Sequence, residues 1–356
     1  MRVRLLPALV GLVLLAAACN GQSPGAESPG AESDAGADAT EETESPADAP
    51  VTLYTGRSLE LVGPLLDQFQ EETGIALEIR SGDTAELAAT IMEEGARSPA
   101  DVYFAQDAGA LGALSKEGLL AELPDELLDR VDPRFRATDG TWVGASGRAR
   151  TMVYSTELVT EEEVPDSVLD LTDPQWQGRV GWAPTNGSFQ AFATAMRVQL
   201  GDEETREWLE GMVANDVQTF ENNAAQVEAA GRGEIAIGLV NHYYLYRFTE
   251  ESPDFAAANK FLAGDDPGAL VNVAGLGVLE TSDQQERALE LVDFLLSQEA
   301  QEYFSEETSE YPLVEGVAAR DDLPPLDELD TPDIDLSDLD DLAGTLELLQ
   351  DAGVLD

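Results

Sequence analysis

Cysteine and histidine are almost absent from this 356-residue chain, which has one of each, Cys19 and His242. A single cysteine excludes a disulfide framework. One cysteine and one histidine are also too few ligands for a zinc site of the usual His/Cys type. A Ser-His-Asp hydrolase would have to use His242, and the chain has no GxSxG, GxxxxGK[ST] or HExxH motif. A glycosidase with paired carboxylates stays open, because acids occur everywhere and no pair stands out.

Positive charge is also scarce. The chain has 19 Lys and Arg against 71 Asp and Glu, a formal net charge of −52. Binding to nucleic-acid phosphates needs basic patches, so we expect no nucleic-acid partner. The acids are spread along the chain, as on the solvated surfaces of salt-adapted proteins, and their field also attracts cations. No apolar run of membrane-spanning length occurs beyond the N-terminus, so we expect no internal transmembrane helix.

The N-terminus reads as a targeting segment. Residues 1–19 combine two arginines, an apolar stretch and three alanines directly before Cys19. This arrangement resembles a bacterial lipobox, which implies lipidation of Cys19; the alternative is an ordinary signal peptide with an incidental cysteine. Residues 20–50 are rich in Gly, Ala, Ser, Pro and acids, as in a disordered tether. We therefore expect a lipid-anchored protein at the cell surface or in the periplasm.

The chain after the tether alternates strand and helix patterns. Strands are predicted at 51–55, 75–83 and 99–105, each followed by a helical pattern, which predicts a parallel α/β sheet. Ligands bind such sheets at the carboxyl ends of the strands. Here those ends carry residues 55–58, 80–84 and 104–107.

The alternation restarts further along, which predicts a second α/β unit. We expect strands at 147–156, 178–184, 234–240 and 271–280, and helices at 185–201, 203–214, 222–233 and 284–304. The chain would cross between the units near 147–151 and again near 270, giving two lobes around a cleft. The expected domains are lobe 1 at 51–148 plus about 271–320, lobe 2 at 149–270, and an acidic segment at 321–356 that packs on the lobes.

Two adjacent tyrosines, Tyr243 and Tyr244, follow the buried strand 234–240. Neighbouring residues of a regular strand point to opposite faces, whereas at a helix start both can reach one cavity. Phenolate is a hard anionic donor suited to Fe³⁺, which displaces the phenol proton. The structural alternative is two buried aromatic residues whose hydroxyl groups are hydrogen-bonded.

Seven motifs together resemble the ferric-iron-binding proteins, the solute receptors of bacterial iron(III) ABC importers. They run in family order from about residue 51 and include LYTGRS (53–58), SPADVYFAQD (98–107), GRARTMVY (147–154), GWAPTNGSFQ (181–190) and GLVNHYY (238–244). The remaining two are SGDTAEL (81–87) and FENNAAQVEA (220–229). The resemblance implies a two-lobed class II periplasmic-binding-protein clamshell, with the ligand in the cleft between the lobes.

The resemblance places the family's paired tyrosine ligands on Tyr243 and Tyr244. Other family ligands are missing here, because Ser58 stands where many members have a histidine and Phe189 where some have a tyrosine. Gln106 stands where some members have a glutamate, with Asp107 beside it. The implied set is two phenolates, with Gln106, Asp107 and Ser58 left open as additional metal or cleft residues.

The family fills the remaining iron positions with water or a synergistic anion such as carbonate, phosphate or citrate. The anion-holding segment resembles Asn186, Gly187 and Ser188, at a predicted helix N-terminus. Two asparagines match further polar contacts, and two arginines could neutralise the anion or the phenolates. These four residues are Asn223, Asn241, Arg57 and Arg150. For Arg150 a hinge salt bridge is the structural alternative.

The sequence thus predicts a binding protein and not an enzyme. It would capture Fe³⁺, with an anion or chelator, and deliver it as a monomer to an ABC-transporter permease. The nearest alternative is a metal-free receptor for an organic anion such as a phosphonate. A secreted acid-based hydrolase and a surface lipoprotein without ligand are the alternatives from other classes.

Overall fold

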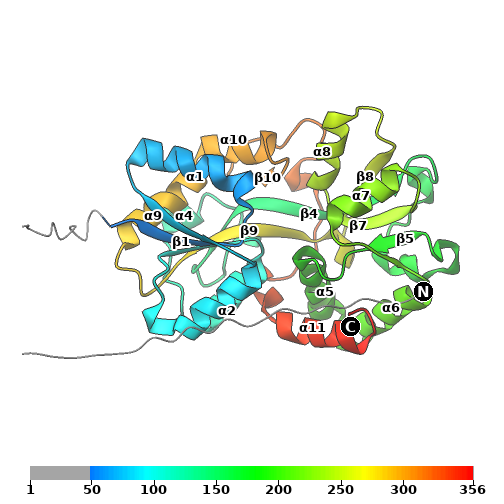
Figure 1. Ribbon diagram of the computed structural model, residues 1–356, viewed down its shortest axis with the longest axis horizontal. Helices are drawn as coiled ribbons and strands as arrows, with labels where there is room; N and C mark the ends of the chain where they lie inside the picture. The colour runs from blue at the N-terminus through cyan, green and yellow to red at the C-terminus, as the bar shows by residue number, and fades with distance from the viewer. Residues whose placement is uncertain (1–48, 356) are drawn as a thin grey trace, which may run out of the picture. The chain divides into compact units, whose positions relative to one another are not determined.

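The computed structural model describes residues 49–355, so Cys19, the expected signal sequence and most of the expected tether lie outside the described residues. Within this range no helix is both long and apolar enough to span a membrane. The ten strands of the described part form one hydrogen-bonded array whose two halves share a single long strand (Figure 1).

The first half of the array is a mixed sheet. Its strands β1, β2 and β3 are parallel, and β9 and β10 run antiparallel to their neighbours. The order is β2-β1-β3-β9-β4, with β10 pairing β4. The bounds are β1 (Val51–Thr55), β2 (Leu77–Ser81), β3 (Val102–Ala105), β9 (Val271–Val278) and β10 (Tyr311–Pro312).

The second half is built on the other end of β4 (Val143–Ser155), which pairs with β7 and β8 there. Strands β5 and β6 continue the sheet beyond β7. The bounds are β5 (Val180–Trp182), β6 (Gln218–Thr219), β7 (Ile237–Asn241) and β8 (Ala257–Phe261).

Strand β4 changes partners at one point. Its pairing with β9 ends at Ala149, opposite Val271, and its pairing with β7 begins at Arg150, opposite Asn241. The backbone N–H of Arg150 donates to Leu270 O at 2.8 Å, so β9 begins beside the same point. The shared strand therefore brings the ends of β7 and β9 together in the middle of the molecule.

Helices cover both faces of each half (Figure 1). In the first half α1, α9 and α10 lie across the sheet from α2, and in the second half α7 and α8 lie across from α5 and α6. The helices are α1 (Leu59–Thr73), α2 (Thr84–Glu94), α3 (Ala108–Lys116), α4 (Asp125–Leu128), α5 (Gly187–Leu200), α6 (Asp202–Ala214), α7 (Asn223–Gly231), α8 (Tyr243–Glu251), α9 (Gln285–Leu295), α10 (Gln298–Glu306) and α11 (Leu342–Asp351).

Most of the predicted elements are confirmed within a few residues, but three expectations need correction. The segment 284–304 is two helices and not one, because α9 ends at Leu295 and the Ser297 hydroxyl caps α10 by accepting from Ala300 N. Strand β4 begins at Val143, four residues before the predicted start at 147. The hydrophobic pattern also missed α8 and β8, which are only nine and five residues long, because the period of so short a segment is ambiguous.

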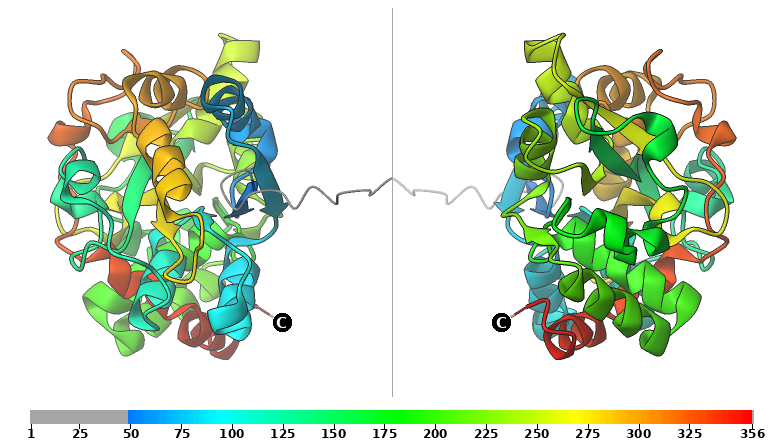
Figure 2. Two further views of the ribbon diagram at one scale, coloured as in Figure 1. Left: turned by 90° about the vertical axis from the view of Figure 1, so that its left-hand side faces the viewer. Right: turned by 90° about the vertical axis from the view of Figure 1, so that its right-hand side faces the viewer.

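The C-terminal segment packs across both halves. The short helical turn η9 (Leu336–Asp340) contacts α3, and α11 packs on α5 and α6 (Figure 2). The approach to α3 needs glycine, because a Cβ added at Gly109 or Gly112 would lie 2.1 Å from Leu339 O or 2.3 Å from Ser337 O. Lys116 and Arg197 add ion pairs to Asp340 and Asp341. These contacts hold the C-terminal segment against α3, α5 and α6.

Candidate functional site

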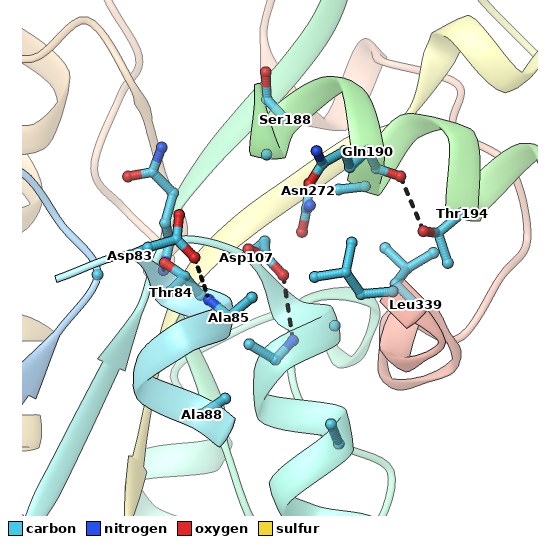
Figure 3. Close-up of a pocket in the computed structure, with 18 of the residues that line it drawn as sticks. Asp83, Thr84, Ala85, Ala88, Asp107, Ser188, Gln190, Thr194, Asn272 and Leu339 are labelled. Carbon is cyan, nitrogen blue, oxygen red and sulfur yellow. Dashed lines mark hydrogen bonds between the residues drawn. The ribbon is translucent and has the colours of Figure 1, made fainter. Parts of the chain in front are cut away.

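A cavity of about 540 Å³ opens where the two halves of the array meet. The N-terminal turns of α2, α3 and α5 point toward it, and the partner switch of β4 lies at its base (Figure 3). Leu339 of the C-terminal segment faces it from the side opposite α2 (Figure 3). Pockets of this size hold small organic ligands, with typical volumes of about 300–1,000 Å³.

Two arginines of β4 line this cavity, Arg148 and Arg150. Side chains two residues apart on a strand share a face, so both point the same way. Each stands opposite an asparagine that also lines the cavity: Arg148 faces Asn272 of β9, and Arg150 faces Asn241 of β7. The cavity base therefore carries two Arg–Asn pairs, one from each half of the array.

Both guanidinium groups are buried without an acidic partner. The exposed fractions are 2% for Arg148 and 4% for Arg150, and among residues 49–355 neither has a carboxylate within 4.0 Å. In the same described range, Nε of Arg148 and Nη2 of Arg150 have no hydrogen-bond partner. A buried cation without a salt-bridge partner is costly, which favours an anion at this base, and the buried carboxylate of Asp107 compensates part of the charge of Arg148.

Arg150 contacts several residues of the site and has a shifted pKa. Its Nη1 donates to Ser188 Oγ at 3.4 Å and to Asn241 Oδ1 at 3.3 Å, and its guanidinium lies 5.1 Å from the Phe192 ring centre. Burial lowers the pKa of Arg150 to about 9, against the opposing influence of the Tyr243 and Tyr244 hydroxyl groups. The hinge salt bridge considered for Arg150 is not seen in the described part of the chain.

The anion-holding segment expected at 186–188 forms the N-terminus of α5. The Asn186 side chain caps the helix by accepting from Ser188 N at 3.0 Å and also accepts from Ser188 Oγ at 2.6 Å. Asn223 Nδ2 donates to both residues, and Asn223 Oδ1 accepts from Asn241 N at 3.3 Å. Gly187 is exposed at the start of the helix. Asn186, Gly187, Ser188, Asn223 and Asn241 are therefore brought together beside Arg150.

The two tyrosines stand at the start of α8, directly after β7. Their rings are stacked, with centres 4.4 Å apart and planes at 28°, so both phenols lie on the same side of the chain. Burial, followed by the charge of Tyr243 and a hydrogen bond with it, raises the pKa of Tyr244. The nearby Arg148 and Arg57 charges oppose this rise. Neither tyrosine lines the cavity itself, but the hydroxyl groups of both act electrostatically on Arg150, which does line it.

His242 fixes the start of α8. Its Nδ1 accepts from Ala149 N at 3.1 Å, and the proton on Nε2 is donated to Ser309 O at 2.8 Å. Burial lowers the pKa of His242 to about 4, so the ring is neutral at pH 7. The imidazole is thus fully occupied in joining β4, α8 and the loop at 309, and it holds the backbone that presents Tyr243.

Arg57 is buried in a different contact. Its Nη2 donates to both carboxylate oxygens of Glu310, at 2.9 and 2.8 Å, while within the described residues its Nε and Nη1 have no partner. Ser146 Oγ also donates to Glu310, at 2.8 Å. Ser58, the next residue, precedes α1 with an exposed side chain that makes no capping bond. Most of the charge of Arg57 is therefore compensated by Glu310.

Gln106 and Asp107 lie on the cavity wall opposite α5. Gln106 N donates to Thr84 Oγ1 at 3.2 Å, and the carboxylate of Asp107 accepts from Ala110 N at 3.2 Å as the cap of α3 (Figure 3). Burial raises the pKa of Asp107, and Arg148 acts in the opposite direction. Asp107 is therefore already bonded to the helix that it begins.

Among residues 49–355, no three His, Cys, Asp or Glu side chains converge as a metal site would need. A metal held here would need tyrosine oxygens or oxygens of its co-ligand. Sequence reasoning missed Arg148 and Asn272. The spacing Arg-Ala-Arg at 148–150 was a usable signal for the first, because alternate strand residues share a face. Asn272 becomes visible only once the register of β9 on β4 is known.

Residues 97–337 match the model of a family described as bacterial extracellular solute-binding proteins. The major ferric iron-binding protein of Neisseria meningitidis serogroup B is 33% identical over 314 residues, which cover 87% of this chain and 95% of that protein. The Fe(3+)-binding periplasmic protein of Serratia marcescens is 30% identical over 87% of this chain and 92% of that protein.

Solved structures show the same fold. Iron-bound HitA from Pseudomonas aeruginosa superposes with a TM-score of 0.79 at 37% identity, over 85% of this chain and 99% of that one. A Trichodesmium protein in complex with iron and citrate gives a TM-score of 0.75 at 28% identity, over 86% and 100% of the two chains. The expected two-lobed class II fold is thus confirmed, and the chain belongs to the bacterial extracellular solute-binding proteins, a family of transport receptors and not of enzymes, alongside the ferric iron-binding proteins.

Proposed function

We propose that this protein captures ferric iron together with an anion or chelator and delivers it to the permease of an ABC importer. The observation that carries the proposal is the stacked Tyr243–Tyr244 pair at the start of α8, beside the buried Arg150. Relatives at 30–33% identity over 87% of this chain are named for ferric iron binding, and they support the same cargo here.

The two phenols supply hard oxygen donors for Fe³⁺. Metal binding would remove both phenol protons, and the positive charges of Arg148 and Arg57 favour the phenolate form of Tyr244. Two phenolates fill only part of the coordination of Fe³⁺. Ser58 is exposed and Asp107 is engaged as a helix cap, so we assign the remaining positions to the co-ligand. Gln106 and Asp107 line the cavity and remain additional cleft residues.

The anion site is proposed at the N-terminus of α5. Ser188, Asn223 and Asn241 already form one hydrogen-bonded group with Asn186, and Arg150 adds a charge. Carbonate, phosphate and citrate all carry oxygens that such donors bind, aided by the helix N-terminus. Closure of the lobe formed by 149–270 on the lobe formed by 51–148 and 271–320 would enclose the complex.

The proposal also covers the attachment of the receptor to the membrane, its location and its oligomeric state. Lipidation at Cys19 would attach the protein to the membrane surface, with residues 20–50 as a tether and residues 321–356 packed on the lobes. The receptor would act as a monomer in the periplasm or at the cell surface. Mass spectrometry of the membrane fraction tests the anchor, because a lipidated N-terminal Cys19 has a characteristic added mass that a Cys19→Ala variant lacks.

Titration with Fe³⁺–citrate tests the metal proposal. Ferric phenolate gives a visible charge-transfer band, which should saturate at about one iron per protein and disappear in the Tyr243→Phe/Tyr244→Phe double variant. Tyr154→Phe is the matched control, since this tyrosine lies in β4 and its conversion leaves the pair intact. A wild-type protein that develops no band, while the metal stays in solution, would contradict the proposal.

A metal-free anion receptor is the second candidate. It is favoured by Arg148 and Arg150, which have no carboxylate partner among residues 49–355. Under this alternative the tyrosines are buried aromatics, and the double variant would only weaken anion binding. A thermal-shift series with phosphonates and carboxylates in the presence of a metal chelator distinguishes the two: stabilisation without metal, unchanged by added Fe³⁺, would support the alternative.

A further inference from the structure

Helix α8 belongs to the second half of the array, because it follows β7 directly, but one of its faces contacts the first half. The contact is made by the loop around β10, a strand that pairs with Ser146 and Gly147 of β4. Just before the helix, the His242 ring is hydrogen-bonded to Ser309 O of this loop at 2.8 Å. The helix that carries the two tyrosines is therefore attached to both halves.

Arg320 joins residues of both halves. Its Nη1 donates to Glu250 Oε1 of α8 at 2.5 Å and to Ser309 Oγ at 2.8 Å. Its Nε and Nη2 donate to the two carboxylate oxygens of Asp322, at 3.0 and 3.2 Å. The guanidinium also lies 4.8 Å from the centre of the Tyr246 ring. The Arg320 side chain is only 20% exposed, so solvent ions screen these contacts less than those of an ordinary surface ion pair.

Helical periodicity places these contacts on the face of α8 that carries Tyr243. Residues at i, i+3 and i+7 share one face of an α-helix, and Tyr243, Tyr246 and Glu250 have this spacing. The Tyr246 hydroxyl adds a hydrogen bond to Asp322 O at 3.4 Å. A contact that holds Tyr246 and Glu250 in place therefore also fixes the direction in which Tyr243 points.

A further ion pair between α8 and the first half is weaker. Arg247 Nη2 lies 3.6 Å from Glu60 Oε1 of α1, and both side chains are more than half exposed. Ion pairs with this exposure contribute little, because water and salt screen them. Beyond its first turn, the attachment of α8 to the first half therefore depends mainly on Arg320.

We propose that Arg320 is a positioning residue of the ferric site, which holds the tyrosine face of α8 against the first half and so slows the release of the cargo. The proposal rests on the proposed function for the identity of that cargo. Rotation of one half against the other moves α8 relative to the loop around β10. The contacts of Arg320 with Glu250 and Tyr246 then break, so they oppose opening of the cleft.

Arg320→Gln tests the proposal. Arg232→Gln is the matched control, because it removes the same charge from an exposed pair with Glu228 that lies within the second half. Each protein is loaded with Fe³⁺–citrate, a strong chelator is added, and the decay of the ferric phenolate band gives the release rate. An ion pair and a cation–π contact together change a rate constant by about 5–30-fold, so Arg320→Gln should release iron faster by roughly that factor. Arg232→Gln should release it at the wild-type rate.

A double-variant cycle separates the contact with α8 from a general loss of stability. Glu250→Gln should also accelerate release, because it removes the same ion pair. The Glu250→Gln/Arg320→Gln double variant should be no faster than Arg320→Gln alone, whereas independent structural effects would add. Additive effects, or release at the wild-type rate in Arg320→Gln, would overturn the role of Arg320.

A metal-free measurement distinguishes this proposal from the ferric function. Hydrogen exchange of the amides at 243–251 is followed by mass spectrometry in the apo protein. Arg320→Gln should exchange faster than the wild type in this segment, and Arg232→Gln should not. Unchanged exchange in Arg320→Gln would overturn the role of Arg320. A missing iron band in every protein overturns the ferric function alone, because hydrogen exchange still decides whether Arg320 holds α8.

Discussion

The hydroxyl groups of Thr194 and Thr345 lie 2.8 Å apart in a buried contact that joins α5 to α11. Thr345 also accepts from Arg197 Nη1 at 3.0 Å. The contact holds the C-terminal wall of the cavity to the helix that carries the anion segment. Removing one hydroxyl leaves its partner buried without that bond, at a cost of about 1–3 kcal/mol.

We therefore expect Thr345→Val to lower the free energy of unfolding by about 1–2 kcal/mol in urea titrations. The Thr194→Val/Thr345→Val double variant should lose less than the sum of the two single variants, because both partners are then apolar. Strictly additive losses would show that the two hydroxyl groups do not interact.

A side chain at Gly109 should disturb the contact between α3 and the C-terminal segment. An alanine Cβ there would lie 2.1 Å from Leu339 O, so the backbone of the C-terminal segment must shift. Gly109→Ala should destabilise the protein by about 1–3 kcal/mol. Gly187→Ala at the start of α5 is the matched control, since its Cβ would meet no atom within 4 Å and the change should stabilise the protein by about 0.4–1 kcal/mol. Chemical unfolding of both variants checks the sign of each change.

Arg57 and Glu310 form a buried ion pair with both side chains fully covered. Glu310→Gln leaves the guanidinium without its counter-charge, and such a loss costs about 3–5 kcal/mol. The Arg57→Met/Glu310→Gln double variant should regain part of this loss, because no unpaired charge stays buried. A double variant less stable than Glu310→Gln would contradict this account of the pair. Urea titration near neutral pH measures all three proteins.

His242 predicts a pH dependence. Burial lowers its pKa to about 4 from an ordinary value near 6.5, so the folded protein resists protonation of the ring. The stability that the neutral ring provides is present above pH 6.5 and is lost as the pH falls through about 4. In His242→Asn the amide oxygen can still accept from Ala149 N, but no group titrates there.

The stability difference between the wild type and His242→Asn should therefore shrink by about 3 kcal/mol between pH 7 and pH 4. Unfolding is measured at several pH values in the apo protein, so that iron binding does not contribute. The carboxylates titrate in both proteins and cancel in the comparison. A difference that stays constant over this range would exclude titration of His242 as its source.

The sequence predicted the elements whose apolar residues repeat regularly. The strand at 51–55 and the helices at 84–94 and 187–200 bury continuous faces, so their patterns are unambiguous. The break at Ser297 was missed because the apolar pattern continues through it, while a single hydroxyl restarts the helix. The spacing of apolar residues does not show whether a helix continues or whether a capping residue begins a new helix.

The site was predictable where it is contiguous in sequence. The segment 186–188 and the tyrosine pair are local motifs, and the structure places Asn186 and Ser188 beside Arg150. Arg148 and Asn272 were missed because their pairing depends on the register of two strands more than a hundred residues apart. The contact of Arg57 with Glu310 is equally long in range, so no sequence spacing could have revealed which charge compensates it.

The partner switch of β4 has a mechanical consequence. Ala149 is the last residue of β4 that pairs with β9 and Arg150 is the first that pairs with β7, so the peptide unit between these two residues joins the two halves of the array. Any rotation of one half of the array against the other twists this strand and changes the angle between the two guanidinium groups. A ligand that binds both arginines at once would set that angle, so the identity of the ligand would be coupled to the relative orientation of the two halves of the array.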